Sequence, residues 1–242
     1  MKRSFLILAA VAAVGAAQAQ ILSQTSFETA EGYAPGALLG QQGWDSELPA
    51  NTNYTVSRLR PHTGNYSTHI DTDPLSGTNW IWQSLNKTPG VDVAPIIKAS
   101  VWVNIGAPFQ STSSLTSSFG FGAYDFTGAL VASLRIRSNG TVQTSTGTTV
   151  TTSATILRDT WYKLDMSMDY TTKMASFAVD GASFGSASFT PSTLGDVDLM
   201  ATASGFDVGY YDDYKVEAVP EPATLTAMGL GLLALARRRR SK

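Results

Sequence analysis

Four aspartates supply the kind of ligand that hard cations take. Asp71 and Asp73 stand two residues apart before a Pro/Gly turn, and Asp212 and Asp213 are adjacent near the end of the body. Calcium binds clustered carboxylate oxygens, so these residues make calcium the candidate cofactor. The alternative is that Asp71 and Asp73 accept hydrogen bonds within a turn, and that one of Asp212 and Asp213 fixes a loop backbone.

Tryptophans offer flat apolar faces for the CH groups of a pyranose ring, with polar groups nearby to fix its orientation. Trp102 alternates onto the polar side of its segment, away from the flanking valines, and Trp80 and Trp82 share one side of theirs. These three are the candidate carbohydrate-binding residues. The alternative for each is burial in the core. For Trp44 and Trp161 we expect packing in the core or at the edge of a sheet.

The remaining composition excludes several chemistries. The chain has no cysteine, which removes thiol catalysis, thiolate metal sites and disulfides, and it has two histidines, His62 and His69. A serine nucleophile needs a base beside it, and no Gly-x-Ser-x-Gly motif is present. We therefore expect no catalytic residue of these kinds.

The segments that must position the candidate residues have a hydrophobic period of two. In "WYKLDMSMDY" (residues 161–170) alternate residues are apolar, and "IIKASVWVNI" (residues 96–105) follows the same pattern. This alternation predicts half-buried antiparallel strands. The residues predicted to face the core are Ile97, Ala99, Val101, Val103, Ile105, Leu134, Ile136, Tyr162, Leu164, Met166, Met168, Tyr170, Phe177, Val179, Tyr214 and Val216. Since the body has no sustained helical period, we predict an all-β, two-sheet antiparallel sandwich.

Residues 141–155, "TVQTSTGTTVTTSAT", are mostly Thr and Ser. A disordered linker is one interpretation. We favour an exposed pair of strands with a turn at Gly147, because β-branched Thr suits strands and hydrophobic strands flank the segment.

Three segments resemble the concanavalin-like or laminin-G-like jelly roll. They are "SFETAEGYAPGALLGQQGW" (residues 26–44), "WYKLDMSMDY" with the following "FAVDG", and "YYDDYKV" (residues 210–216). The resemblance implies one sandwich domain over residues 20–218. Laminin-G-like modules bind calcium through acidic loop residues, which agrees with the calcium prediction.

Glucanases of this fold carry Glu-x-Asp-x-x-Glu on one strand, and glycoside hydrolysis needs two such carboxyl groups. That string is absent here, and Glu28 suits a loop that it hydrogen-bonds. We therefore expect a non-enzymatic protein, with a divergent polysaccharide-degrading or -modifying enzyme as the alternative. A carboxylate pair in a groove beside surface tryptophans would favour the enzyme.

The C-terminal segment, residues 219–242, has three parts: Pro220-Glu221-Pro222, an uncharged apolar stretch at 223–236, and Arg237, Arg238, Arg239 and Arg240. The apolar stretch would form a helix of about 21 Å, shorter than the hydrocarbon core of about 30 Å. Adjacent arginines mark the cytoplasmic end of a membrane segment. We therefore predict a short transmembrane helix with the C-terminus inside. A plain tail anchor, which is not processed, is the alternative to a sorting signal.

This order of parts resembles the PEP-CTERM sorting signal of Gram-negative bacteria that produce exopolysaccharide. The resemblance implies processing by an exosortase near the Pro-Glu-Pro. At the other end, residues 1–19 have the basic start, short apolar run and small-x-small site of a signal peptide, cleaved between Ala19 and Gln20.

The charge of the mature body differs from that of the whole chain. Of 17 basic and 19 acidic residues, seven basic and no acidic ones lie in residues 1–19 and 223–242, so the body carries a formal charge of −9. Such a body argues against nucleic acid as a partner. We predict an exported component of the cell surface or exopolysaccharide matrix, anchored transiently in the inner membrane. Its expected partners are the secretory machinery, an exosortase, and a polysaccharide or matrix protein; a purely structural protein without a ligand is a further alternative.

Overall fold

The computed structural model describes residues 18–47, 53–72, 77–106, 117–203 and 207–220. Several predicted features lie outside the described residues. They are residues 1–17 of the signal peptide, Asp73, Glu221, Pro222, and the sorting helix with Arg237–Arg240.

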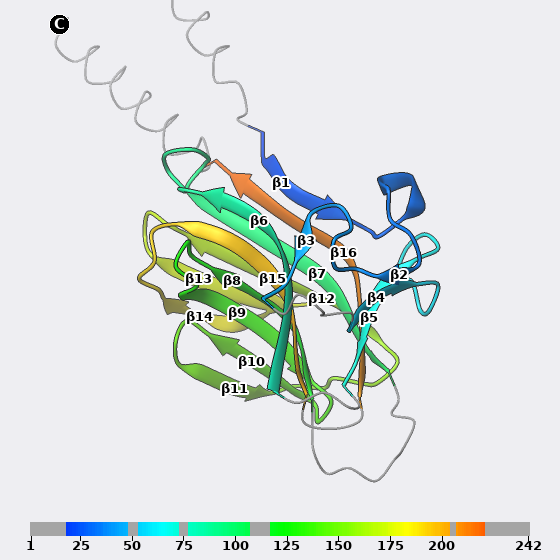
Figure 1. Ribbon diagram of the computed structural model, residues 1–242. Helices are drawn as coiled ribbons and strands as arrows, with labels where there is room; N and C mark the ends of the chain where they lie inside the picture. The colour runs from blue at the N-terminus through cyan, green and yellow to red at the C-terminus, as the bar shows by residue number, and fades with distance from the viewer. Residues whose placement is uncertain (1–17, 48–52, 73–76, 107–116, 204–206, 221–242) are drawn as a thin grey trace, which may run out of the picture.

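Two antiparallel sheets are stacked face to face (Figure 1), as the sequence predicts. The nine-stranded sheet has the order β14-β13-β12-β7-β16-β5-β4-β2, and β1 also pairs with β16. Its strands are β1 (Gln20–Thr25), β2 (Gly36–Ala37), β4 (Tyr54–Ser57), β5 (Ser67–Asp71), β7 (Ile96–Gly106), β12 (Trp161–Asp169), β13 (Met174–Val179), β14 (Ala182–Ser188) and β16 (Val208–Val219).

The seven-stranded sheet has the order β11-β10-β9-β8-β15-β6-β3. Its strands are β3 (Trp44–Asp45), β6 (Gly77–Lys87), β8 (Ser118–Tyr124), β9 (Leu130–Arg137), β10 (Thr141–Ser145), β11 (Thr149–Ser153) and β15 (Leu194–Ala203). Within the described residues the helical structure is one short 3-10 turn, η1 (Thr29–Glu31).

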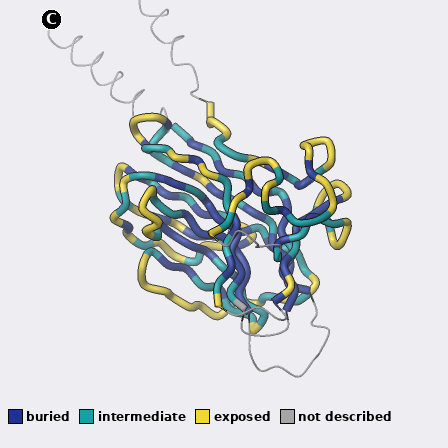
Figure 2. Tube along the Cα trace, in the orientation of Figure 1, coloured by how far each residue is buried: buried dark blue, intermediate teal, exposed yellow. Residues whose placement is uncertain are grey.

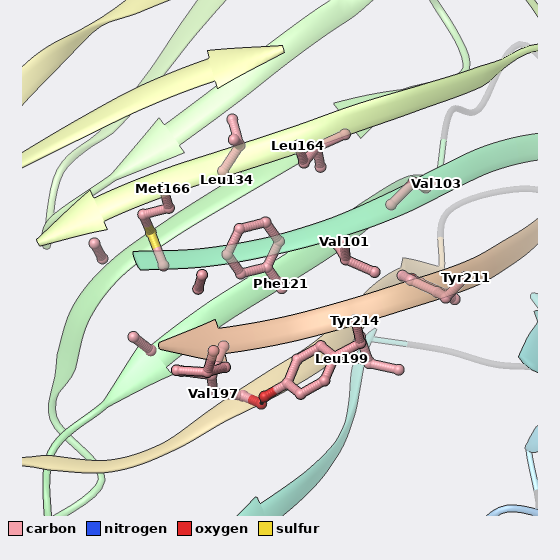
Figure 3. Packing of buried hydrophobic residues seen from close by; sticks show 14 of the residues in the cluster. Val101, Val103, Phe121, Leu134, Leu164, Met166, Val197, Leu199, Tyr211 and Tyr214 are labelled. Atoms are coloured by element: carbon pink, nitrogen blue, oxygen red, sulfur yellow. Dashed lines mark hydrogen bonds between the residues drawn. The ribbon is translucent and has the colours of Figure 1, made fainter. Parts of the chain in front are cut away.

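The predicted alternation is confirmed strand by strand. Tyr162, Leu164, Met166 and Met168 on β12 are buried, and so are the alternating apolar residues of β7. The buried residues of Figure 2 lie between the two sheets, and Figure 3 shows side chains of both sheets meeting there. The Thr/Ser segment forms the predicted hairpin, β10 paired with β11, at the exposed edge of the seven-stranded sheet.

Three buried tyrosines of the nine-stranded sheet hydrogen-bond across the core to β15. The hydroxyl of Tyr214 donates to the carbonyl of Val197 (2.8 Å), that of Tyr211 to Met200 (2.6 Å), and that of Tyr54 to Leu199 (3.2 Å). Apolar packing has no preferred direction, whereas these directional hydrogen bonds fix the position of β15 relative to the other sheet. The strand is therefore held firmly, and its opposite face presents side chains outward.

Glu28 connects the first loop to the body. Its Oε1 accepts hydrogen bonds from the backbone N–H groups of Asn65 (2.6 Å) and Tyr66 (2.8 Å). This is the loop-fixing role expected from the sequence.

Candidate functional site

The outer face of the seven-stranded sheet carries an unusual set of side chains. On β15, Val197 and Leu199 are buried in the core, so Asp196 and Asp198 point to the opposite face. β6 and β8 flank β15 and follow the same rule. They place Trp80, Trp82 and Tyr124 on this outer face as well, because their neighbours Ile81 and Ala123 are buried.

These side chains line one open pocket of about 190 Å³. Its lining residues are Glu47, Trp80, Trp82, Tyr124, Gly128, Asp196 and Asp198. The Trp80 Nε1 donates a hydrogen bond to the Tyr124 hydroxyl (3.1 Å), which joins the side chains of β6 and β8 across β15. The pocket thus combines aromatic rings with carboxyl groups, the two kinds of group that recognise sugars.

Glycines on β8 leave room beside Tyr124, which lines this pocket. Gly120 and Gly122 alternate with the buried Phe119 and Phe121, so β8 presents no side chain outward at these two positions. A Cβ on Gly122 would stand 2.6 Å from the sulfur of Met200 and 3.2 Å from the Tyr124 ring. The glycine therefore lets Met200 and Tyr124 lie flat across β8.

Asp196 and Asp198 form a carboxyl pair on one side of β15. Asp198 is only 5% exposed, and the Oδ1 atoms of both side chains have no hydrogen-bond partner among the described residues. Burial, followed by the charge of Asp196, raises the pKa of Asp198 well above its ordinary value. Burial also raises the pKa of Asp196. The raised pKa values favour a protonated carboxyl group, which acts as both hydrogen-bond donor and acceptor.

Trp102, the third predicted carbohydrate-binding residue, lies on the far side of the molecule. It faces outward from the nine-stranded sheet and stacks against the His62 ring, with centroids 3.9 Å apart. His62 in turn contacts Asp213 (Nδ1 to Oδ2, 2.7 Å). The structure therefore brings Trp80 and Trp82 together and separates them from Trp102.

Among the predicted calcium ligands that the structure describes, Asp71 lies on β5, and Asp212 and Asp213 lie on β16. Asp212 is fully buried, and its Oδ2 accepts hydrogen bonds from the backbone N–H groups of His62 (2.8 Å) and Thr63 (3.1 Å). Asp71 ends β5 and pairs with Val208, four residues before Asp212 on β16. Among the described residues, no group of three or more His, Asp or Glu side chains is placed to hold a metal. Calcium binding stays a prediction.

A larger hollow, about 550 Å³, lies over the outer face of the nine-stranded sheet. Its lining is mostly lysine, serine and acidic residues, without tryptophan or tyrosine. Lys163 contacts Asp165 (2.8 Å) and Lys215 contacts Glu217 (2.6 Å), so most of its charges are paired along their own strands. We consider it a solvated, ion-paired surface, and the smaller aromatic pocket the better candidate site.

Sequence reasoning overlooked five lining residues of the pocket: Glu47, Tyr124, Gly128, Asp196 and Asp198. The signal was present in "GDVDLM", where acidic and apolar residues alternate, and in "FGFGAY", where glycine alternates with phenylalanine. Neither pattern shows which strands lie beside β15.

Comparison with known proteins describes the two parts of the chain separately. A family profile, the PEP-CTERM protein-sorting motif, matches residues 218–240, so the C-terminal segment carries this sorting motif, which indicates export and anchoring in a membrane before processing. No curated protein sequence matches the chain. Among the described residues no helix is long and apolar enough to span a membrane; the predicted sorting helix lies outside them.

The body resembles solved structures in fold alone. A carbohydrate esterase, vb_24B_21, from Shiga toxin-encoding bacteriophage phi24B aligns with a TM-score of 0.59 and 10% identity, over 84% of this chain and all of that one. The carbohydrate recognition domain of Emp47p aligns with a TM-score of 0.50 and 8% identity, over 85% of this chain and 99% of that domain. A sialidase aligns at 0.53 and 11% identity, over 81% of this chain but only 18% of its own length. The body is an all-β, jelly-roll-like sandwich.

Proposed function

We propose that the protein is an exported, exosortase-processed component of the cell surface or exopolysaccharide matrix, and that its body binds polysaccharide without cleaving it. The observation that carries the proposal is the pocket on the seven-stranded sheet, where Trp80, Trp82 and Tyr124 surround a carboxyl pair. The sorting motif at residues 218–240 and the fold of the body support this location and this class of ligand.

Binding of the purified full chain to a panel of soluble polysaccharides tests the proposal. Trp80→Ala and Trp82→Ala should each weaken binding about tenfold or more, because stacking against a sugar face is lost. Trp102→Ala is the matched control, since it removes a partly buried tryptophan from the opposite sheet. Unchanged binding in the Trp80 and Trp82 variants, or loss in Trp102→Ala alone, would move the site away from this pocket.

One observation favours the enzymatic alternative. Asp196 and Asp198 are a carboxyl pair beside surface tryptophans, which is the arrangement that we expect of an enzyme rather than of a binding protein. A hydrolase needs its two carboxyl groups on either side of the scissile bond, about 5–10 Å apart. Here the two carboxyl groups interact directly with each other, which leaves no separation for a scissile bond between them, and this is why we rank binding first. New reducing ends, released by the wild-type chain but not by Asp198→Asn, would reverse that ranking.

A further inference from the structure

The pocket on the seven-stranded sheet contains acidic groups, and none of its described lining residues is a cation. Three of its lining residues, Glu47, Asp196 and Asp198, carry carboxyl groups, and no lysine, arginine or histidine is among them. Arg135 on β9 shares this face of the sheet, but its Nη1 donates to the Thr202 hydroxyl (3.1 Å). An anionic sugar entering the pocket would therefore meet like charge with no counter-ion.

The groups that face the carboxyl pair from other elements are also acidic or neutral. Glu47 follows β3, Tyr124 ends β8, and Asp125 comes directly after it; all three act on the pair electrostatically. From the opposite sheet, Tyr54 and Tyr214 lie below Asp198, and burial raises the pKa of both hydroxyls, so they stay neutral. None of these described groups stabilises two ionised aspartates side by side, so the surroundings favour a protonated form of the pair.

The Oδ1 atoms of Asp196 and Asp198 indicate that the pocket is built to receive a hydrogen-bonding ligand. Both atoms are buried and have no hydrogen-bond partner in the part of the chain that the structure describes, and Asp198, which lines the pocket wall, is more than nine-tenths buried. Buried polar atoms are nearly always hydrogen-bonded, and exceptions at a pocket indicate a partner that is not part of the chain. Neutral sugar hydroxyls both donate and accept, which matches a carboxyl pair that offers one proton and several lone pairs.

We infer that this pocket selects uncharged sugar residues and rejects uronic and other acidic sugars, and that Asp198 determines this selectivity by acting as a neutral hydrogen-bonding group. The inference rests on the proposed carbohydrate-binding function and names its substrate class. Trp80 and Trp82 supply contact area that any pyranose can use, whereas the carboxyl pair sets which substituents are tolerated.

The test compares polysaccharides that differ in charge. The purified full chain is titrated with a glucan, a xylan and methyl-esterified polygalacturonate, and with unesterified polygalacturonate and alginate. Binding to one or more neutral polymers, with affinity for the acidic ones at least about tenfold lower, is the expected result. Equal or tighter binding to the acidic polymers, lost in Trp80→Ala, would overturn the inference and leave the proposed function standing. Binding to none of the five would overturn both.

Variants at position 198 test the role of the neutral form. Asn offers one donor and one acceptor in the shape of a protonated Asp, so Asp198→Asn should bind neutral polymer within about threefold of wild type. Asp198→Ala should lose about tenfold or more, with an unchanged circular-dichroism spectrum as the check on folding. Wild-type affinity should fall as pH rises and ionises the pair, whereas the Asn variant should bind almost independently of pH. An Asn variant as weak as the Ala variant would show that the ionised carboxylate is needed and would refute the inference.

Discussion

The hydroxyl of Tyr214 donates a hydrogen bond to the backbone carbonyl of Val197, 2.8 Å away in the opposite sheet. Val197 lies between Asp196 and Asp198, so this bond fixes the piece of β15 that presents the carboxyl pair. Val197 and Tyr214 face each other in the core in Figure 3. The polar pocket on the surface is thus positioned by a polar contact inside the hydrophobic core.

Tyr214→Phe should lower the free energy of unfolding by about 1 kcal/mol, because one buried hydrogen bond is lost while the ring still fills its space. Binding of neutral polysaccharide should weaken too, because β15 is held less firmly. Tyr162→Phe is the control: its hydroxyl also bonds to backbone, at Leu157 and Thr155, far from β15 in the sequence. Chemical denaturation and a binding titration measure both effects. Equal loss of binding in the two variants would mean that general stability, not the position of β15, controls the site.

Two glycines on β8 should respond differently to the same substitution. A Cβ on Gly120 would stand 2.1 Å from the carbonyl oxygen of Leu134 and 2.7 Å from the Cα of Arg135, which are backbone atoms that cannot move aside. Gly120→Ala should therefore destabilise the protein by about 3 kcal/mol.

A Cβ on Gly122 instead meets the sulfur of Met200, at the flexible end of a side chain. Gly122→Ala should cost less than about 1 kcal/mol, because Met adapts and Ala favours a strand more than Gly does. Its main effect should be on Tyr124, which lines the pocket and whose ring stands 3.2 Å from the added Cβ, and so on binding. Thermal melts and the same titration separate the two variants, and a Gly122→Ala protein with full affinity would show that Gly122 does not position Tyr124 for binding.

Stability should depend on pH through buried aspartates. Burial raises the pKa of Asp212 to about 7, against about 3.9 in an unfolded chain. Between these values the folded protein holds a proton that the unfolded chain has lost, so the free energy of unfolding falls as pH rises from about 4 to about 7. Asp198 contributes with the same sign, since its pKa is also raised.

His69 acts in the opposite direction, because burial lowers its pKa and its charging destabilises the fold below about pH 6.5. Variants are therefore needed to separate the aspartate contributions to the pH dependence of stability from that of His69. Melting temperatures of wild type, Asp212→Asn and Asp198→Asn, measured from about pH 5 to about pH 8, should show a shallower decline in each variant than in wild type. Parallel curves for all three proteins would mean that neither carboxyl group titrates in this range.

The sequence predicts more of the sandwich than of the site, for a physical reason. Burial of one face of a strand imposes a period of two on its apolar residues. Tyr162, Leu164 and Met166 therefore predict their strand even when the neighbouring strands are not known. The pocket depends on pairing between β6, β15 and β8, which lie far apart in the chain. From the sequence alone, Asp196 and Asp198 resemble an ordinary solvated strand face, and only the flanking aromatics of β6 and β8 bury them. Trp102 is the opposite case: from the sequence alone its ring is expected to be open to a ligand, and nothing near it in the sequence indicates that His62 covers it.

The sorting segment offers a test that does not depend on the pocket. Adjacent arginines hold one end of a membrane segment on the cytoplasmic side, so they should fix the orientation in which an exosortase meets the Pro-Glu-Pro. Replacing Arg237, Arg238, Arg239 and Arg240 with Ser should leave a large fraction of the chain unprocessed in the membrane, whereas replacing them with Lys should preserve processing because the charge is kept. Immunoblots of membrane and released fractions from the producing bacterium measure the ratio. Complete release of the Ser variant would show that the proline motif and the apolar stretch suffice for sorting.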